Sequence, residues 1–478
     1  MKQLLLPKRI VKAQGVINAK SLKVKKPLQV ILRRDEEWIY ATNAVLEGKG
    51  YIILDFGKEM SGGIRIITGK NELAQSKIRV RFGESLTECC SSIGDKGATN
   101  DHSPRDFEYV LPWFADIKIG GTGFRFVRID YLEDAFCVIQ NIFCENEILY
   151  KTALYRYSGK DKRVSDIFET AKRTIDLCSA GDYIWDGVKR DRLVWIGDMH
   201  PEMLALVTLY GRMDKIERSL EFVRDQTPLN EWMNGITSYS LWWMIIVADY
   251  CFNTGAYDFA KKQVEYMKGL INRFDEVTGD DGALNHSWFF VDWPTRDSED
   301  GEAGVRAINI IAVKKVIELF SSLGEDVTAA KKLLSKLMIK PIVVKKMKQV
   351  IALKYFALGA LSDDEYDKLI DGGAKGLSTF MSYYILKAIA YKDPVKAIEI
   401  MKEYYGAMLD LGATTFFEDF DIEWAKNSCR IDKFPKKGQT DIHGDFGAHC
   451  YVGFRHSLCH GWSSGVLPFI KEYEDYIE

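Results

Sequence analysis

The sequence has almost no net charge and no long apolar run, and both absences narrow what the protein can be. It holds 65 basic and 68 acidic side chains in 478 residues, so it lacks the basic excess typical of nucleic-acid-binding domains. No apolar segment approaches the roughly 20 residues that a membrane-spanning helix needs. We therefore expect no nucleic-acid partner and no membrane insertion. With 47% apolar residues, the chain can bury a sizeable core.

Paired cysteines and a secretion signal are also missing. The nine cysteines are an odd number with no Cys-x-x-Cys pair, and the adjacent Cys89 and Cys90 are poorly placed to bridge each other. Reduced thiols therefore fit better than a disulfide framework. Only three consecutive leucines precede Pro7, which is too short for the core of a signal peptide. These features predict a cytoplasmic protein.

Several common motifs are absent as well. The sequence contains no P-loop, no Gly-x-Gly-x-x-Gly after a predicted strand and no Gly-x-Ser-x-Gly turn, so nucleotide binding and serine-hydrolase chemistry have no support. Four of the seven histidines are His443, His449, His456 and His460, and the last two are spaced as zinc ligands on one helix face can be. No HExxH or paired cysteines accompany them. We expect them to line a pocket or cap helices, and we expect no metal site.

Residues 1 to about 140 have the alternating pattern of β-strands. The segments at 51–69, 76–86 and 115–132 alternate apolar and polar residues and are interrupted by glycines. The polar, glycine-bearing segment at 89–106 is expected to be a long loop. Short strands at this spacing indicate a β-sandwich.

From about residue 160 the apolar residues recur at helical spacing. Roughly twelve helices are expected, the first including Ile167, Ala171 and Ile175 and the others near 201–211, 214–226, 238–252, 256–274, 302–323, 326–337, 340–356, 363–373, 376–391, 394–409 and 456–474. Twelve helices in one domain suit a toroid of six helical hairpins. A solenoid is the alternative, but no repeat of fixed length is found. We predict a β-sandwich at 1–145 followed by an (α/α)6 barrel at 146–478.

Tryptophans and acids gather in the predicted inter-helix segments. Nine of the eleven tryptophans lie between 185 and 462, and several adjoin acidic residues, as in Trp185–Asp186 and Asp292–Trp293. Such aromatics can simply wedge helices together. The alternative is a carbohydrate pocket, because a pyranose ring offers an apolar face for an aromatic side chain and hydroxyls for carboxylates. A second acidic and aromatic cluster spans 412–424. Two acid loops meeting over one pocket could supply the two carboxyl groups that glycoside cleavage requires.

Several of these segments together resemble the α-L-rhamnosidases of glycoside hydrolase family 78. "DGVKRDRLVWIGD" at 186–198 is similar to their Asp-Cys-Pro-x-Arg-Glu-Arg-x-Gly-Trp-x-Gly-Asp signature. "GATTFFEDF" at 412–420 and "SLCHGWSSGVLPFI" at 457–470 resemble two further family segments, and "FVDWP" and "SYSLWWMIIVADYCFNTGAYDF" have counterparts in the same order. The resemblance covers about residues 180–470, and the preceding β-sandwich matches it.

The resemblance implies an (α/α)6 barrel and inverting hydrolysis of terminal α-L-rhamnosides without a cofactor. Asp191 matches the family's general acid and Glu418 its general base. The resemblance further implies sugar-binding or supporting roles for eight residues: Asp186, Arg190, Trp195, Asp198, Trp243, Asp292, Trp293 and His460. Asp186 and Asp198 are expected to raise the pKa of Asp191 by like-charge proximity, with Arg190 balancing their charge.

The sequence departs from the family pattern at the acid itself. Most members have Glu where this chain has Asp191, which sets the carboxyl about one methylene further back; a displacement of about 1 Å can cost on the order of 100-fold in rate. Phe417 replaces a tryptophan, and a C-terminal β-sandwich usual in the family does not follow the last predicted helix. These departures indicate a divergent member, whose sugar is rhamnose or a related one.

Two alternatives of other classes remain open. The shorter acid would suit a sugar-binding protein that does not hydrolyse its ligand. A lyase or epimerase on the same six-hairpin fold is the other alternative, although a lyase would usually want a Tyr or His base and a basic pocket. The sequence does not indicate the linkage, the aglycone or the oligomeric state.

Overall fold

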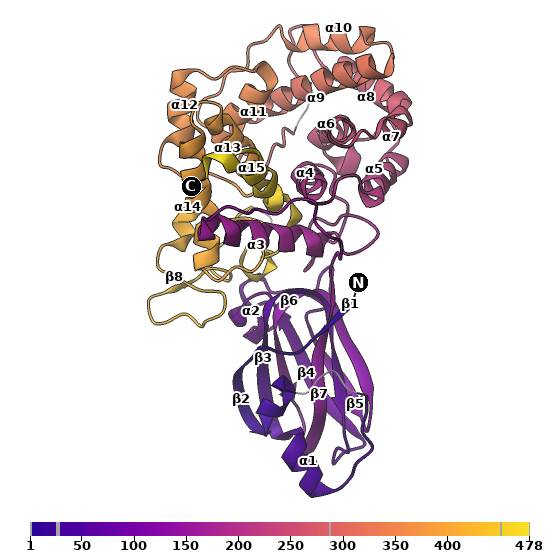
Figure 1. The fold of residues 1–478 in the computed structure, drawn as a ribbon, viewed down its shortest axis with the longest axis vertical. Coiled ribbons are helices and arrows are strands. Elements are labelled where there is room, and N and C mark those ends of the chain that lie inside the picture. The colour runs from indigo at the N-terminus through magenta and orange to yellow at the C-terminus, as the bar shows by residue number, and fades with distance from the viewer. Residues whose placement is uncertain (1, 25–28, 286–287, 450–451, 478) are drawn as a thin grey trace.

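The computed structural model describes residues 2–24, 29–285, 288–449 and 452–477. A β-sheet part lies at one end of the molecule and a larger helical part at the other (Figure 1). The strands are β1 (Lys2–Leu5), β2 (Arg9–Ile17), β3 (Ala44–Thr68), β4 (Gln75–Gly83), β5 (Asp106–Pro112), β6 (Asp116–Tyr131) and β7 (Phe136–Glu147), with the short pair β8 (Ser428–Cys429) and β9 (Thr440–Asp441) in the helical part.

The first seven strands form one hydrogen-bonded sheet. Its order is β1-β7-β3-β6-β4-β5, and β2 pairs with β3 outside this path. The long strand β3 shifts its register against β6 between Asp55 and Met60. We predicted two stacked sheets. The structure confirms a β-sheet domain, but hydrogen bonds join its strands into a single sheet.

Apolar residues are buried on both faces of this sheet. In β3, Ile52 and Leu54 belong to the main core of the sheet, whereas Ile53 between them packs with Phe126 and with Leu86 of helix α2 (Leu86–Cys90). Successive strand residues point to opposite faces, so this switch follows from the strand geometry. Helix α2 therefore covers the second face, on the side of the sheet that meets the helical part (Figure 1).

The helices of the helical part follow the predicted order, and the sheet part contains another helix that was not predicted. They are α1 (Glu36–Thr42) in the sheet part and, in the helical part, α3 (Lys162–Cys178), α4 (Met199–Tyr210), α5 (Asp214–Gln226), α6 (Thr237–Thr254), α7 (Tyr257–Lys261), α8 (Val264–Val277), α9 (Gly301–Leu323), α10 (Thr328–Leu337), α11 (Lys348–Leu358), α12 (Asp363–Ile370), α13 (Ser382–Ala390), α14 (Pro394–Asp410) and α15 (Val466–Glu472). Within the described ranges, no helix combines the length and apolarity needed to cross a bilayer.

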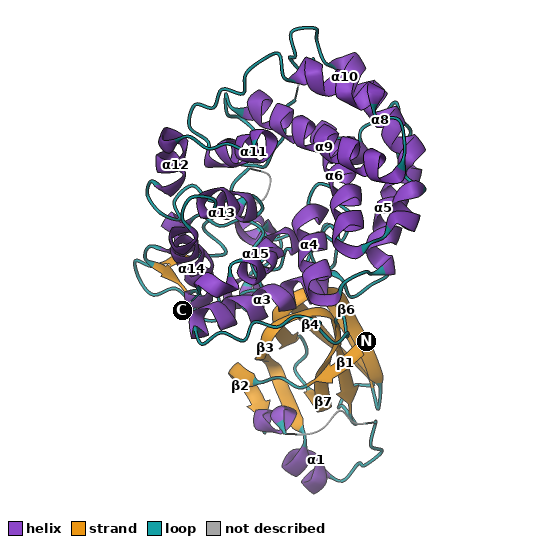
Figure 2. Ribbon diagram, turned by 45° about the horizontal axis from the view of Figure 1, so that its top comes forward, coloured by secondary structure: helices purple, strands orange, loops and turns teal. Residues whose placement is uncertain are grey.

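The helices are arranged as a ring (Figure 2). Contacts run from α4 to α6, α9, α11, α13 and α15, and from α15 back to α4. Helices α6 and α9 of this circuit are buried on nearly all sides, whereas α5 and α8 outside it bury one face and expose the other. The division of the chain into domains at residue 145 stays a prediction.

Three predicted helices start at least six residues later than their sequence pattern suggested. The one predicted at 376–391 begins at Ser382. The segment predicted at 340–356 becomes helical only at Lys348, because the backbone N–H groups of residues 345–347 donate to the carboxylate of Asp300. The helix predicted at 456–474 begins at Val466, so the prediction that His456 and His460 share a helix face is wrong. There the backbone N–H groups of His460 and Gly461 donate to Phe416 and Asp186 of other loops.

Candidate active site

The two acid segments predicted from the sequence meet at one cavity of about 340 Å³. It is lined by Asp186, Asp191, Trp195, Asp198, Asn234, Gly235, Ile236, Tyr239, Trp288, Phe290, Trp293, Glu418, His460 and Trp462. A larger cavity of about 520 Å³ lies beside α3 and contains none of the predicted site residues. The smaller cavity is the candidate active site because it combines buried carboxyl groups with an aromatic wall.

The segment at 186–198, which joins α3 to α4, is held in a tight loop. The Leu193 N–H donates to the Asp186 carboxylate at 2.9 Å, and the Asp186 N–H donates back to the Leu193 carbonyl at 3.1 Å. At its tip Asp191 and Arg192 both have φ of 54°, in the left-handed region that non-glycine residues seldom occupy. Strained backbone of this kind concentrates at functional sites. The loop thus turns the Asp191 carboxyl into the cavity.

Arg190 connects the two predicted catalytic carboxyl groups. Its Nη1 lies 3.1 Å from Oδ2 of Asp191, and its Nη2 donates to Oε1 of Glu418. The Arg190 Nε also donates to the Arg455 carbonyl at 2.8 Å. One buried guanidinium therefore positions both carboxyl groups and supplies their counter-charge.

Glu418 is held as an anion. It is buried, and burial raises its pKa, but the positive charge of Arg190 and of protonated His460 and His456 outweighs this and lowers the pKa to about 2. Burial lowers the pKa of His460 to about 4 and that of His456 to about 3, so Arg190 is the cation that acts on Glu418 at neutral pH. The Ser457 N–H donates to the second Glu418 oxygen at 3.0 Å.

The pKa values of Asp186 and Asp198 are shifted in the opposite direction, upwards. Burial, followed by the charges of Asp191 and Asp198, raises the pKa of Asp186 well above its usual range. Burial likewise raises the pKa of Asp198 to about 8, although the Tyr239 hydroxyl, which donates to it at 2.7 Å, opposes the shift. Asp198 is thus neutral at pH 7 and can donate a hydrogen bond to a sugar hydroxyl.

His460 lies between these carboxyl groups. Its Nε2 is 3.7 Å from Asp186, 3.9 Å from Asp198 and 3.8 Å from Glu418. Its Nδ1 is buried, and none of the residues that the structure describes offers it a hydrogen-bond partner. The predicted cluster of Asp186, Asp198, Glu418 and His460 is therefore brought together in one place.

Aromatic side chains form the other wall of the cavity. Trp195 and Tyr239 meet edge to face with centroids 6.2 Å apart, and Phe290 lies 5.0 Å from Trp293 and 5.3 Å from Trp288. Such a wall offers an apolar platform to the C–H face of a ring while the carboxyl groups meet its hydroxyls. The arrangement is suited to a carbohydrate.

The remaining predicted residues differ in where they lie. Asp292 is buried against Ser378 and Thr295 and, together with Trp293, lines a small adjoining cavity of about 20 Å³ that Glu418 also borders. Trp243 lies elsewhere: it is fully buried, and its indole N–H donates to the Leu220 carbonyl of α5. It belongs to the packing between α6 and α5, so its assignment to sugar binding is corrected.

Four residues that the sequence did not single out contribute to the site. Tyr239, Asn234 and Phe290 line the cavity, and Tyr239 stands four residues before Trp243 in the segment quoted for its resemblance. His102, from the predicted loop at 89–106, lies with its Nδ1 3.2 Å from Oδ1 of Asp191. No local pattern in the sequence marks His102, because 88 residues lie between it and Asp191.

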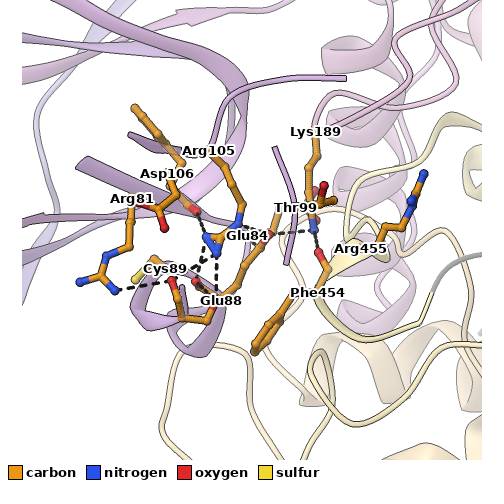
Figure 3. Close-up of polar contacts among 12 residues, drawn as sticks. Arg81, Glu84, Glu88, Cys89, Thr99, Arg105, Asp106, Lys189, Phe454 and Arg455 are labelled. Carbon is orange, nitrogen blue, oxygen red and sulfur yellow. Dashed lines mark hydrogen bonds and ion pairs between the residues drawn. The ribbon is translucent and has the colours of Figure 1, made fainter. Parts of the chain in front are cut away.

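A second charged cluster lies beside the site at the junction with the sheet. Glu84, Glu88 and His443 have the spacing of metal ligands, and they are the one such group among the residues that the structure describes. The Lys189 ammonium lies 3.3 Å from Glu84 and 3.0 Å from Glu88 and donates to the Phe454 carbonyl (Figure 3). It also donates to the His456 carbonyl. A side-chain cation thus already balances this cluster.

Sequence comparisons identify no relatives, whereas the fold does. No protein-family model matches the sequence, and no curated protein matches it significantly. A rhamnosidase from Klebsiella oxytoca with rhamnose bound has a TM-score of 0.77 at 18% identity, covering 99% of this chain and 96% of that one. A GH78 family rhamnosidase of Bacillus sp. GL1 has a TM-score of 0.70 at 18% identity, covering 92% and 49%.

A third similar structure is the Streptomyces avermitilis α-L-rhamnosidase complexed with L-rhamnose, with a TM-score of 0.62 at 13% identity over 88% of this chain and 42% of that one. The chain thus spans nearly all of the first of these proteins and about half of the other two. The predicted resemblance to α-L-rhamnosidases is confirmed at the level of the fold.

Proposed function

We propose that the protein is an exo-acting, inverting glycoside hydrolase that removes terminal α-L-rhamnosyl or closely related sugar residues from oligosaccharides or small glycosides. The observation that carries this proposal is the pair of Asp191 and Glu418 on one guanidinium, at a cavity with an aromatic wall. A volume of about 340 Å³ suits a single sugar ring, which supports removal of terminal residues. The rhamnose in two similar structures supports the choice of sugar.

In the proposed reaction Asp191 protonates the glycosidic oxygen as its bond to the anomeric carbon breaks. Glu418 takes a proton from the water that attacks the opposite face, and the remaining hydroxyl bonds to the anomeric carbon. The proton on Glu418 returns to solvent and balances the proton that Asp191 gave to the leaving oxygen. A carboxylate kept ionised by Arg190 is suited to the role of base. Asp186, Asp198 and His460 would bind hydroxyls, while Trp195 and Trp293 would contact the ring.

We further propose that the helical part is an (α/α)6 barrel spanning residues 146–478 after a sheet domain at 1–145. The closed circuit of contacts from α4 through α15 supports six inner helices. We also propose a cytoplasmic location, which is supported by the free thiols of all eight described cysteines.

The test is a screen of aryl α- and β-glycosides that includes α-L-rhamnoside, with Asp191→Asn and Glu418→Gln as variants. Release of the aglycone by the wild type is expected, and proton NMR of the first sugar formed should show the inverted anomer. Each variant should lose about 10²–10⁴-fold in kcat, the usual contribution of a general acid or base. Far-UV circular dichroism checks that each variant is folded. Substantial activity in both folded variants would refute the assigned roles.

A binding protein without hydrolytic activity is the second candidate. It is favoured by the Asp191 carboxyl, whose two oxygens both have positively polarised partners, Arg190 and His102, as suits a fixed anion. Calorimetry with L-rhamnose separates the two functions: binding without release from any aryl glycoside would establish this candidate instead.

A further inference from the structure

A loop of the sheet part reaches the catalytic segment and is built to stay there. The Ser103 hydroxyl donates to the Lys189 carbonyl at 2.5 Å, and the Thr122 hydroxyl of β6 donates to the same carbonyl at 3.0 Å. The Asn100 side chain accepts from the Arg105 N–H at 3.0 Å and donates to the Asp106 carbonyl at 2.8 Å. The loop therefore approaches the acid segment through fixed hydrogen bonds on both sides of His102.

His102 is the residue of this loop that contacts Asp191. Its Nδ1 lies 3.2 Å from Oδ1 of Asp191, and its Nε2 faces Asp101 at 3.8 Å. Asp101 in turn pairs with Arg455 at 2.8 Å. The φ of His102 is 63°, so the backbone adopts a rarely populated conformation to present this ring. Among the described residues, the acidic groups that face the His102 ring are thus Asp101 and Asp191.

The surroundings of Asp191 pose a chemical problem for an acid. Its Oδ2 is 3.1 Å from the Arg190 guanidinium, which can only donate hydrogen bonds and so cannot supply the carboxylate with an exchangeable proton. A general acid must carry a proton at the working pH and regain it after every turnover. The Asp191 side chain is only 7% exposed, whereas His102 beside it is 34% exposed and can both hold and release a proton.

We propose that His102 and Asp191 share one proton. His102 is then the positioning residue that returns a proton to Asp191 after each turnover. This inference rests on the proposed function. As the glycosidic C–O bond breaks, Asp191 passes the shared proton to the leaving oxygen, and the pair is left as neutral imidazole and carboxylate. One proton from water then restores the pair, which balances the proton that Glu418 takes from the attacking water and returns to solvent.

The experiment varies the leaving group. An alkyl α-L-rhamnoside needs protonation of its leaving oxygen, whereas a 2,4-dinitrophenyl α-L-rhamnoside releases a stable anion without it. In His102→Gln we expect kcat/KM to fall about 10- to 100-fold for the alkyl glycoside, as expected for partial loss of general acid catalysis. For the dinitrophenyl glycoside it should stay within about twofold, since Glu418 and the sugar pocket are untouched.

Two further readouts separate proton supply from a structural role. The basic limb of the kcat/KM profile for the alkyl glycoside should move to lower pH in His102→Gln, because the proton is then held by Asp191 alone beside Arg190. Imidazole in the buffer should restore part of the activity of His102→Ala. Lys96→Gln, at an exposed position in the same loop, serves as the matched control and should leave both profiles unchanged.

The outcomes are distinguishable from failure of the proposed function. If the wild type releases no aglycone from any glycoside, the proposed function fails. If the wild type is active but His102→Gln loses equal activity on both leaving groups, or none on either, the shared proton is overturned and hydrolysis stands. His102→Gln combined with Asp191→Asn should be no slower than Asp191→Asn alone, and an additive loss would also overturn it.

Discussion

Replacing Lys189 by methionine should destabilise the protein strongly, because this side chain supplies positive charge at the buried junction between the sheet and the segment at 186–198 (Figure 3). Its ammonium lies 3.3 Å from Glu84 and 3.0 Å from Glu88, and it donates to the carbonyls of Phe454 and His456 at 2.6 and 2.7 Å. Removing one partner of a buried ion pair typically costs about 3–5 kcal/mol. We expect a loss of that size in the free energy of unfolding at pH 8.

The loss should depend on pH in a defined direction. Burial already raises the pKa of Glu84 to about 7 despite the charge of Lys189, and in Lys189→Met it should rise further. A carboxyl whose pKa is higher in the folded state favours folding at low pH, and this contribution disappears as the pH rises through the folded-state pKa. The deficit of Lys189→Met relative to the wild type should therefore be small near pH 5 and grow towards pH 8.

Urea unfolding followed by tryptophan fluorescence and by far-UV circular dichroism measures this effect. Lys189→Met combined with Glu84→Gln should recover part of the loss, because one uncompensated buried charge is gone. The control is Lys96→Met: Lys96 pairs with Asp445 across the same junction but is 47% exposed, so about 0–1 kcal/mol is expected. If Lys189→Met and Lys96→Met unfold at the same urea concentration at pH 8, the reasoning is refuted.

Three further predictions concern the site and its surroundings. The pKa of Asp198 is raised to about 8, so sugar binding should weaken as the pH rises through that value; Tyr239→Phe removes the hydrogen bond that opposes the rise and should move this limb to higher pH in a KM–pH profile. Trp243→Phe should leave kcat unchanged and lower the melting temperature, because Trp243 packs away from the cavity; a fall in kcat would contradict this. Iodoacetamide at neutral pH should label Cys90 first, because the other described cysteines are buried. The hydrogen bond of Cys90 with Cys89 and the nearby Arg128 outweigh its own burial and lower its pKa to about 7. Peptide mass spectrometry of the labelled protein measures the order of labelling.

Local sequence patterns predicted much of the helical part because the apolar residues that each helix buries recur every three or four positions along that helix. The start and end of α5 match the predicted 214–226, and α9 begins within one residue of its prediction. The pattern failed at 456–465, where apolar residues also recur but the backbone bonds to loops far away in the chain. Those partners, Phe416 and Asp186, come together only in the folded protein, so no local rule could have placed the start of that helix at Val466.

In the site too, residues that are close together in the sequence could be predicted, and a residue that is distant in the sequence could not. Asp186, Asp191, Trp195 and Asp198 lie within thirteen residues of sequence, and a motif can identify them together. The error at Trp243 arose because neighbouring helix residues point about 100° apart. Trp242 stacks on His200 at 5.3 Å, while Trp243 faces α5. His102 was missed for a third reason, since it comes from the sheet part of the chain.

The assignment of the proton donor follows from combining burial with access to solvent. The pKa values of two carboxyl groups in the cavity are far apart, at about 2 for Glu418 and about 8 for Asp198, and such a split is how one site supports acid and base roles at one pH. Asp198 is neutral at pH 7 but only 4% exposed, and Tyr239, whose hydroxyl donates to it, is also buried, so this contact gives it no exposed neighbour through which to regain a proton. Asp191 has one in His102. A donor that must be recharged in every turnover needs that neighbour more than it needs a high pKa of its own, and for this reason Asp191 rather than Asp198 is proposed as the acid.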